Sequence, residues 1–309
     1  MYAKLKFLPP TSNDDILNGL KAVLTGETVV DNIAVTSLDK PNSWIDITLS
    51  NAGWQLHDQV ANVLVVKAPL VDDPTTFKYV RFYWSSDDFY MDMYDGWDNV
   101  AHTTSDTKWG NTYSTLHLNH DAAAGYITLR ITASERHLAV STCTAVAAES
   151  IGLASEYVGF VSEFTRDDMW NTVANGYHST VMGQFAAANP TNPFVTNRYR
   201  EYTGDDLLNG RMYYKTAFGT TNGTSLTNMF GNAASNFMVR NSSNVSVHPL
   251  YSFGCNYPPG RVLGGDLSGY TGMYFTTYAY GVEGDHIFLG AQKYELWETG
   301  DYRYAVKVG

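Results

Sequence analysis

The densest group of acidic side chains lies in the segment Asp87–Asp98, which reads DDFYMDMYDGWD. Carboxylates at such short spacing could hold a calcium ion or supply the paired acid and base of a glycosidase. Apolar and polar side chains alternate through its middle, with Phe89, Met91 and Met93 set against Tyr90, Asp92 and Tyr94. This two-residue period predicts a strand with a solvated acidic face, followed by an Asp-Gly turn. A calcium site at Asp95 and Asp98 stays an alternative, although the full EF-hand spacing is absent.

A second group of polar side chains, His117, His120 and Asp121, forms the pattern H-x-x-H-D. On a helix, a three-residue step keeps two imidazoles on one face, where they could bind a metal ion. On a strand, the same step places them on opposite faces. The surrounding sequence TYSTLHLNHDAAAG is typical of a strand that runs into a turn. We therefore predict no metal site there.

Recognised catalytic motifs are absent from the sequence. It contains no nucleophile elbow, P-loop, dinucleotide-binding fingerprint or H-E-x-x-H zinc helix. The pairs His57-Asp58 and Arg136-His137 have no third partner that the sequence reveals. We expect a protein that is not an enzyme and uses no cofactor.

One amphipathic helix is expected near the N-terminus, ahead of the segments that could carry chemistry. Ser12 and Asn13 can cap it, and Gly26 can end it. Its apolar stripe consists of Ile16, Leu17, Leu20, Val23 and Leu24. Such a helix would cover a sheet, or alternatively dock into a neighbouring protein.

From Trp44 onward the sequence is typical of strands separated by turn residues. Alternation predicts strands at 44–49, 63–66, 79–84 and 126–132, and shorter strands at 211–218, 272–280 and 294–297. The end of the chain, GDYRYAVKVG, predicts a last strand that completes the protein's own sheet, or alternatively adds to a neighbour's edge. The fold class is therefore mainly β, a β-sandwich or barrel-like arrangement with one short N-terminal amphipathic helix.

The run AAANPTNPFVT at Ala186–Thr196 is the best candidate for a domain boundary or a long crossing loop. Its two Asn-Pro pairs disfavour regular structure. We expect a β-rich domain with the helix over residues 1–190 and a second β-rich unit over 197–309, or a single domain over the whole chain.

Composition limits the classes of partner. A net charge of -11, from 20 Lys and Arg against 31 Asp and Glu, disfavours nucleic acid. No run approaches the ~20 apolar residues that span a membrane, and two cysteines are too few for a disulfide framework. The 22 Tyr and 7 Trp suit contacts with other proteins or with sugars. We expect protein partners, no nucleic acid and no membrane, with a glycan as an open alternative.

Five stretches carry a resemblance to a known group of proteins. They are LNGLKAVLTG at 17–26, GWQLHD at 53–58, ITLRITASERHLAV at 127–140, GFVSEFTRDDMWN at 159–171 and KYELWETGDYRYAVKVG at 293–309. Together they resemble an uncharacterised group of virion structural proteins of large contractile-tailed bacteriophages. The resemblance implies a tail, baseplate, neck or capsid-associated part with no established active-site residues to carry across.

The expected function is that of a non-enzymatic structural component of a bacteriophage virion, in the tail or baseplate or at a fibre attachment point. It would act in viral assembly through protein–protein contacts with other virion proteins and with copies of itself, as an oligomer. Its location would be the virion, assembled in the host bacterial cytoplasm. One alternative is a carbohydrate-binding host-recognition module that uses exposed Tyr90, Tyr94 and Trp97. A second is a glycan-degrading tail enzyme that uses carboxylates such as Asp92 and Asp95.

Overall fold

The fold is mainly β, as the sequence predicts. A computed structural model describes residues 2–7, 12–26, 52–70, 73–85, 88–94, 96–104, 113–115, 126–145, 157–165, 178–186, 198–201, 211–216, 219–220, 247–249, 251–256, 261–266, 272–276, 286–299 and 302–308. Strands account for 64% of the described region and helix for 13%, which confirms the predicted class. The sheets are antiparallel, and the described residues form no closed barrel, so the barrel-like alternative is not observed there.

The chain divides into two compact units, Met1–Val161 and Ser162–Gly309. The segment that the sequence singles out as a boundary lies, except for Ala186, outside the described residues. The same holds for the predicted strand at 44–49.

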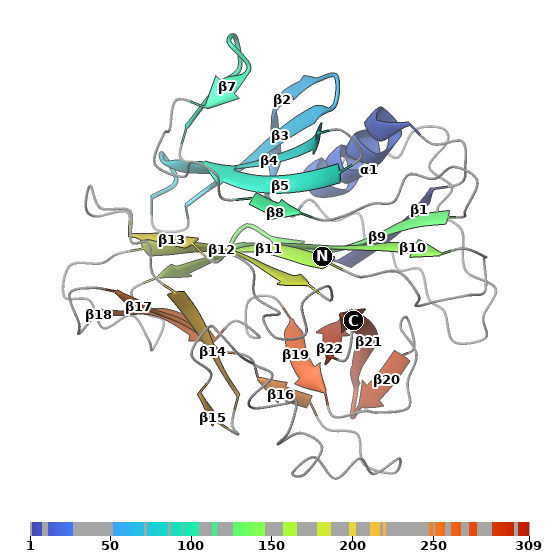
Figure 1. Ribbon diagram of the computed structural model, residues 1–309, viewed down its shortest axis with the longest axis vertical. Coiled ribbons are helices and arrows are strands. Elements are labelled where there is room, and N and C mark those ends of the chain that lie inside the picture. Colours follow the sequence, from blue (N-terminus) through green and yellow to red (C-terminus); the bar gives the residue numbers. More distant parts are fainter. Residues whose placement is uncertain are drawn as a thin grey trace. The chain divides into compact units, whose positions relative to one another are not determined.

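The predicted helix is present as α1 (Asn13–Thr25) in the first unit. The Ser12 hydroxyl accepts a hydrogen bond from the Asp15 backbone N–H, and the Asp15 side chain accepts one from the Ser12 N–H, which makes a capping box. Gly26 ends the helix with a φ of 72°, where a residue without Cβ is unstrained. The predicted apolar stripe is buried, and the helix packs on β1 to β4 (Figure 1), so its role as a cover over sheet is confirmed.

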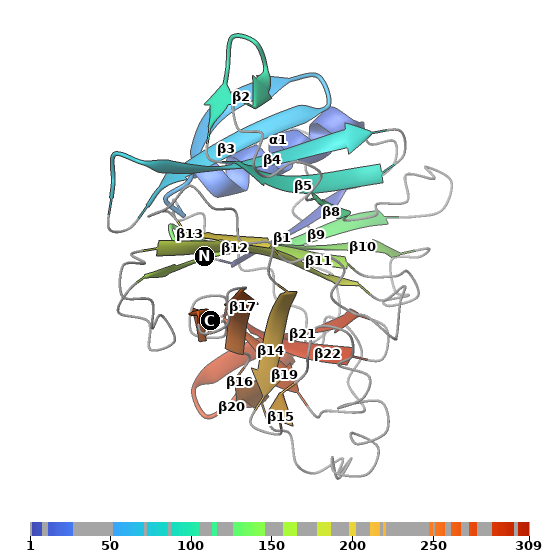
Figure 2. The same cartoon turned by 60° about the vertical axis from the view of Figure 1, so that its left-hand side comes forward.

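A five-stranded sheet, in the order β2-β3-β4-β5-β8, carries the segments with the most polar chemistry (Figure 2). Its strands are β2 (Gln55–Val60), β3 (Val63–Pro69), β4 (Phe77–Ser85), β5 (Asp88–Tyr94) and β8 (Tyr113–Thr115). Alternation in β4 and β5 buries Phe82, Phe89 and Met91. A separate two-stranded hairpin follows β5, formed by β6 (Trp97–Asp98) and β7 (Thr103–Thr104).

A second sheet of the first unit begins with an N-terminal strand that was not predicted. The first four of its six strands in order are β1 (Tyr2–Phe7), β9 (Tyr126–Ser134), β10 (His137–Ala145) and β11 (Tyr157–Thr165). The unit division falls within β11. In β9, Leu129 and Ile131 are buried as their alternation suggests, but Arg130 is buried as well. Both faces of this strand are therefore covered.

Trp54, just before β2, contacts the β9–β10 hairpin. Its indole N–H donates to the Ser134 carbonyl oxygen at 2.9 Å, in the turn between β9 and β10. Gly53 precedes it with a φ of 84°, and a Cβ built there would lie 2.1 Å from Cγ of Glu135. A side chain at position 53 is therefore excluded both by the backbone and by this neighbour.

The second unit contains two antiparallel sheets and one further pair of strands. The pair is β12 (His178–Ala186) with β13 (Arg198–Glu201). One sheet has the order β15 (Gly219–Thr220), β14 (Arg211–Thr216), β17 (Tyr251–Asn256) and β18 (Arg261–Asp266). The other has the order β16 (Val247–Pro249), β19 (Met273–Thr276), β22 (Tyr302–Lys307), β21 (Gln292–Thr299) and β20 (His286–Leu289). Because β22 lies between β19 and β21, the last strand completes the protein's own sheet, as predicted.

Candidate functional site

The hairpin formed by β6 and β7 has a turn that is fixed by its own side chains. The Oδ1 atom of Asp98 accepts hydrogen bonds from the backbone N–H groups of Val100, at 2.8 Å, and Ala101, at 3.0 Å. These bonds hold the pKa of Asp98 below its usual value. His102 closes the turn with a φ of 52°, in the left-handed region. The turn thereby presents Val100 to solvent with 85% of its surface exposed.

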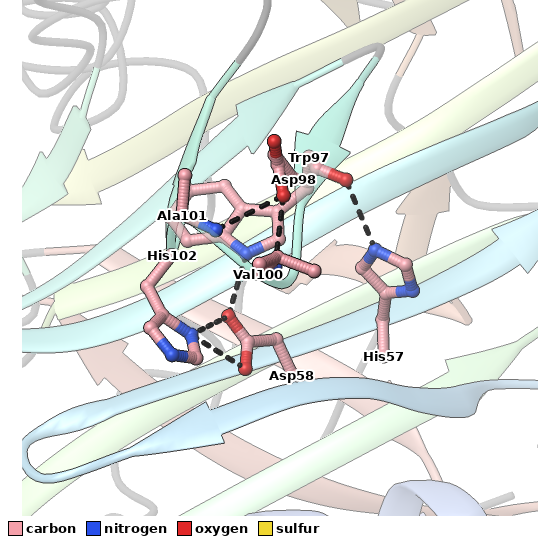
Figure 3. Close-up of polar contacts among 7 residues, drawn as sticks. All are labelled: His57, Asp58, Trp97, Asp98, Val100, Ala101 and His102. Atoms are coloured by element: carbon pink, nitrogen blue, oxygen red, sulfur yellow. Dashed lines mark hydrogen bonds and ion pairs between the residues drawn. The ribbon is translucent and has the colours of Figure 1, made fainter.

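One buried carboxylate, that of Asp58 on β2, joins both strands of the hairpin to the sheet (Figure 3). Its Oδ2 atom accepts the indole N–H of Trp97 at 2.8 Å. The Nδ1 atom of His102 lies 2.9 Å from Oδ2 and 3.1 Å from Oδ1. Since an ionised carboxylate only accepts, Nδ1 of His102 carries the proton in this contact. Asp58 therefore holds the hairpin at two points, Trp97 on β6 and His102 in the turn.

His57, the neighbour of Asp58, also contacts the hairpin. Its Nε2 atom lies 3.2 Å from the Trp97 carbonyl oxygen (Figure 3), and its ring meets Tyr79 edge-on at 4.9 Å. In a regular strand, His57 and Asp58 would lie on opposite faces. The pairing of β2 with β3 shifts register between Leu56 and Asp58. This β-bulge lets two consecutive side chains reach the same hairpin.

A second polar cluster lies where Arg81 on β4 stands directly opposite Asp92 on β5. The Arg81 guanidinium forms a salt bridge with the Asp92 carboxylate, and the Tyr94 hydroxyl donates to Oδ2 of Asp92 at 2.8 Å. The predicted solvated acidic face of β5 is therefore wrong, because Asp92 and Tyr94 are both buried. Strand alternation assigns residues to faces but does not reveal that the second face is also covered.

Burial dominates the electrostatics of the second cluster. It raises the pKa of Asp92, although the Arg81 guanidinium and the Tyr94 hydroxyl act in the opposite direction. Burial and the nearby Asp92 carboxylate also raise the pKa of Tyr94, which keeps this phenol protonated. Nε of Arg81 and Oδ1 of Asp92 are buried without a hydrogen-bond partner. The cluster is therefore tightly packed but incompletely hydrogen-bonded.

Trp97 connects the two clusters. The Arg81 guanidinium lies 5.6 Å from its ring centroid, 3.9 Å from that of Tyr83 and 5.3 Å from that of Tyr94. These distances are typical of cation–π contacts. Because the Trp97 indole also donates to Asp58, one continuous network runs from β4 and β5 through the hairpin to β2.

The polar groups of this network are engaged with one another. Asp58 and Asp92 each accept bonds from neighbouring side chains, and Asp98 caps its own turn. Asp95, the other carboxylate of the enzyme hypothesis, lies outside the described residues. The His102 side chain is 46% exposed, and Asp98 on the same turn is exposed as well. The geometry is that of a structural clamp that joins the hairpin to the sheet and includes the exposed imidazole of His102.

The aromatic side chains expected to stack on sugars are mostly covered. Tyr94 and Trp97 are buried, so their predicted exposure is wrong. Tyr90 is partly exposed and stacks on Tyr83, with ring centroids 5.1 Å apart and planes inclined by 18°.

The structure places the other polar groups that the sequence analysis named away from this network or does not describe them. His117, His120 and Asp121 lie outside the described residues. His137 is buried and contacts Thr132 and the Val161 carbonyl oxygen. Among the described residues, no three His, Cys, Asp or Glu side chains are grouped so that they could hold a metal ion. No helix in the described part has both the length and the apolar character needed to cross a membrane.

The sequence does not predict either polar cluster, the one around Asp58 or the one around Asp92, although it draws attention to several of their residues. The contact of His57 and Asp58 with Trp97 depends on a bulge, and that of Arg81 with Asp92 depends on strand register. Comparison with known proteins supplies no further assignment, because no protein-family model, no curated protein and no solved structure matches the chain.

Proposed function

We propose that the protein is a non-enzymatic structural component of a bacteriophage virion, located in the tail or baseplate or at a fibre attachment point. The resemblance of five sequence stretches to virion proteins of contractile-tailed phages motivates the virion assignment. Within the described residues, the network of carboxylates and aromatic rings serves to join strands, which favours a role based on contacts over one based on chemistry.

The observation that carries the contact role is the exposed Val100 at the end of a fixed turn. A large apolar side chain exposed in this way is stabilised by burial against another protein. The Asp98 cap and the Asp58 bridge already order the hairpin, so little conformational entropy is lost when a partner binds. Repeated copies in an assembly would add avidity to each modest contact.

Mass spectrometry of purified, DNA-containing particles of the phage that encodes the chain tests this proposal. Tails and capsids are separated, and the number of copies of this polypeptide per particle is measured in each fraction. A fixed copy number in the tail fraction is the expected result. Absence of the polypeptide from washed particles would contradict the virion role, and recovery only with capsids would contradict the tail location.

A further inference from the structure

The hairpin of β6 and β7 is held on β2 by side chains, because it forms a two-stranded sheet of its own. Of the contacts that hold it, the Asp58–His102 pair is the one that joins an imidazole to a carboxylate, so that its attraction depends on whether the imidazole is protonated. Trp97 contributes a neutral indole N–H, and His57 contacts only a carbonyl oxygen of the hairpin.

We propose that Asp58 and His102 form a proton-dependent clamp, in which protonated His102 holds the hairpin firmly on β2 and neutral His102 loosens it. With His102 protonated, the contact is a charge-assisted hydrogen bond, roughly twice as strong as a neutral one. With His102 neutral, the imidazole can still donate from Nδ1, but no cation then bonds the buried carboxylate within the described part of the chain.

Among the described residues, the other polar groups near the Asp58–His102 contact are engaged with other partners. Asp98, on the same turn, interacts electrostatically with His102, but its Oδ1 atom accepts the backbone N–H groups of Val100 and Ala101. Arg81 lies near Trp97, but Asp92 and the surrounding rings engage its guanidinium. Tyr94 donates to Asp92 and stays neutral.

The accessibility of His102 matches such a role. Its side chain is 46% exposed, so that protons can exchange with solvent, whereas its partner carboxylate is 6% exposed. His102 also occupies the left-handed region with a φ of 52°, which costs a residue with a Cβ some strain. Loosening the clamp would relieve that strain and free the turn that carries Val100.

NMR spectroscopy of the full chain, with labelled tryptophan indoles and valine methyl groups, tests the proposal between about pH 5 and 8, the range in which imidazoles titrate. The Trp97 indole resonance, assigned with Trp97→Phe, reports the Asp58 bond. The methyl order parameter of Val100 reports the mobility of the turn. We expect one shift of the indole resonance as pH rises, with a parallel fall in the Val100 order parameter.

Two variants separate His102 from its surroundings. His102→Asn keeps a donor near the position of Nδ1 and tolerates the left-handed backbone, but it does not titrate. His57→Gln removes the other imidazole and keeps a donor towards the Trp97 carbonyl oxygen. We expect the pH-dependent step to disappear in His102→Asn and to persist in His57→Gln. A wild-type protein without the step, or a step that survives in His102→Asn, would overturn the proposal.

Discussion

His137 and Thr132 contact each other across the β9–β10 hairpin, with 3.0 Å between Nε2 of the imidazole and Oγ1 of the hydroxyl. The other ring nitrogen, Nδ1, lies 3.2 Å from the Val161 carbonyl oxygen on β11. Because a carbonyl only accepts, Nδ1 carries the proton and Nε2 accepts from Thr132. The neutral imidazole thus has both nitrogens hydrogen-bonded inside the first unit, and a second proton would place a positive charge in a fully buried position.

This contact predicts that the protein loses stability in acid. Burial lowers the pKa of His137 to about 3, whereas an unfolded histidine titrates near 6.5. Between these values the unfolded chain binds one more proton than the folded chain, so the free energy of unfolding falls as pH falls. The slope contributed by His137 is about 1.4 kcal/mol per pH unit. It should be seen in urea unfolding at a series of pH values between about 4 and 6.

A His137→Gln variant provides the control, because it retains a side-chain amide but cannot be protonated. We expect it to be less stable than the wild type at neutral pH and to show a shallower dependence of stability on pH. An unchanged slope in the variant would mean that other groups cause the acid sensitivity.

The left-handed backbone at Gly53 predicts a large cost for Gly53→Ala. The new Cβ would be 2.1 Å from Cγ of Glu135, in addition to the strain of a φ of 84°. We expect a loss of about 2–3 kcal/mol in the free energy of unfolding. Gly290→Ala is the matched control, because its φ is 62° and no atom lies within 4 Å of its Cβ position. It should cost about 1 kcal/mol, from backbone strain alone.

The double variant Gly53→Ala with Glu135→Ala separates the two contributions. Removing the Glu135 side chain should recover the part of the loss that comes from the clash, leaving a cost similar to that of Gly290→Ala. Equal stability of the single and double variants would show that the backbone, and not Glu135, makes glycine necessary at position 53.

Local signals account for the parts of the fold that the sequence predicts correctly. The helix at 13–25 has its caps and its apolar stripe within a few residues of one another. The strand at 77–85 alternates strongly between buried and partly exposed residues. The missed strand β1 has the same kind of signal, because Ala3, Leu5 and Phe7 are buried and alternate with two lysines. That pattern was available in the sequence.

The polar network could not be predicted in the same way. Alternation in β5 assigns Asp92 and Tyr94 to one face, but the partner of Asp92 is fixed by the pairing of two strands. The approach of both His57 and Asp58 to Trp97 depends on a bulge that no turn residue announces. Such contacts arise from strand register, which a single sequence leaves undetermined.

The pairing of Arg81 with Asp92 predicts a strong penalty for removing one partner. Arg81→Met leaves a buried carboxylate without its cation, and we expect a loss of about 3 kcal/mol in the free energy of unfolding. The double variant Arg81→Met with Asp92→Leu should lose less than the sum of the two single variants. Lys67→Met is the control, because Lys67 contacts the ring of Phe77 and leaves no buried carboxylate behind. Additive losses in the double variant would contradict a coupled pair.

The exposed Val100 predicts that one substitution blocks assembly without affecting the fold. Val100→Asp keeps the backbone N–H that donates a hydrogen bond to Asp98. It places a charge where an apolar contact is proposed. Asn99→Asp adds the same charge at the neighbouring exposed position and serves as the control. Both variants should melt near the wild-type temperature. Supplied to a phage lacking the wild-type chain, Val100→Asp should be incorporated about tenfold less, a change of about 1.4 kcal/mol in binding. Equal incorporation of both variants would exclude the hairpin tip from the contact, even if the polypeptide is a part of the particle.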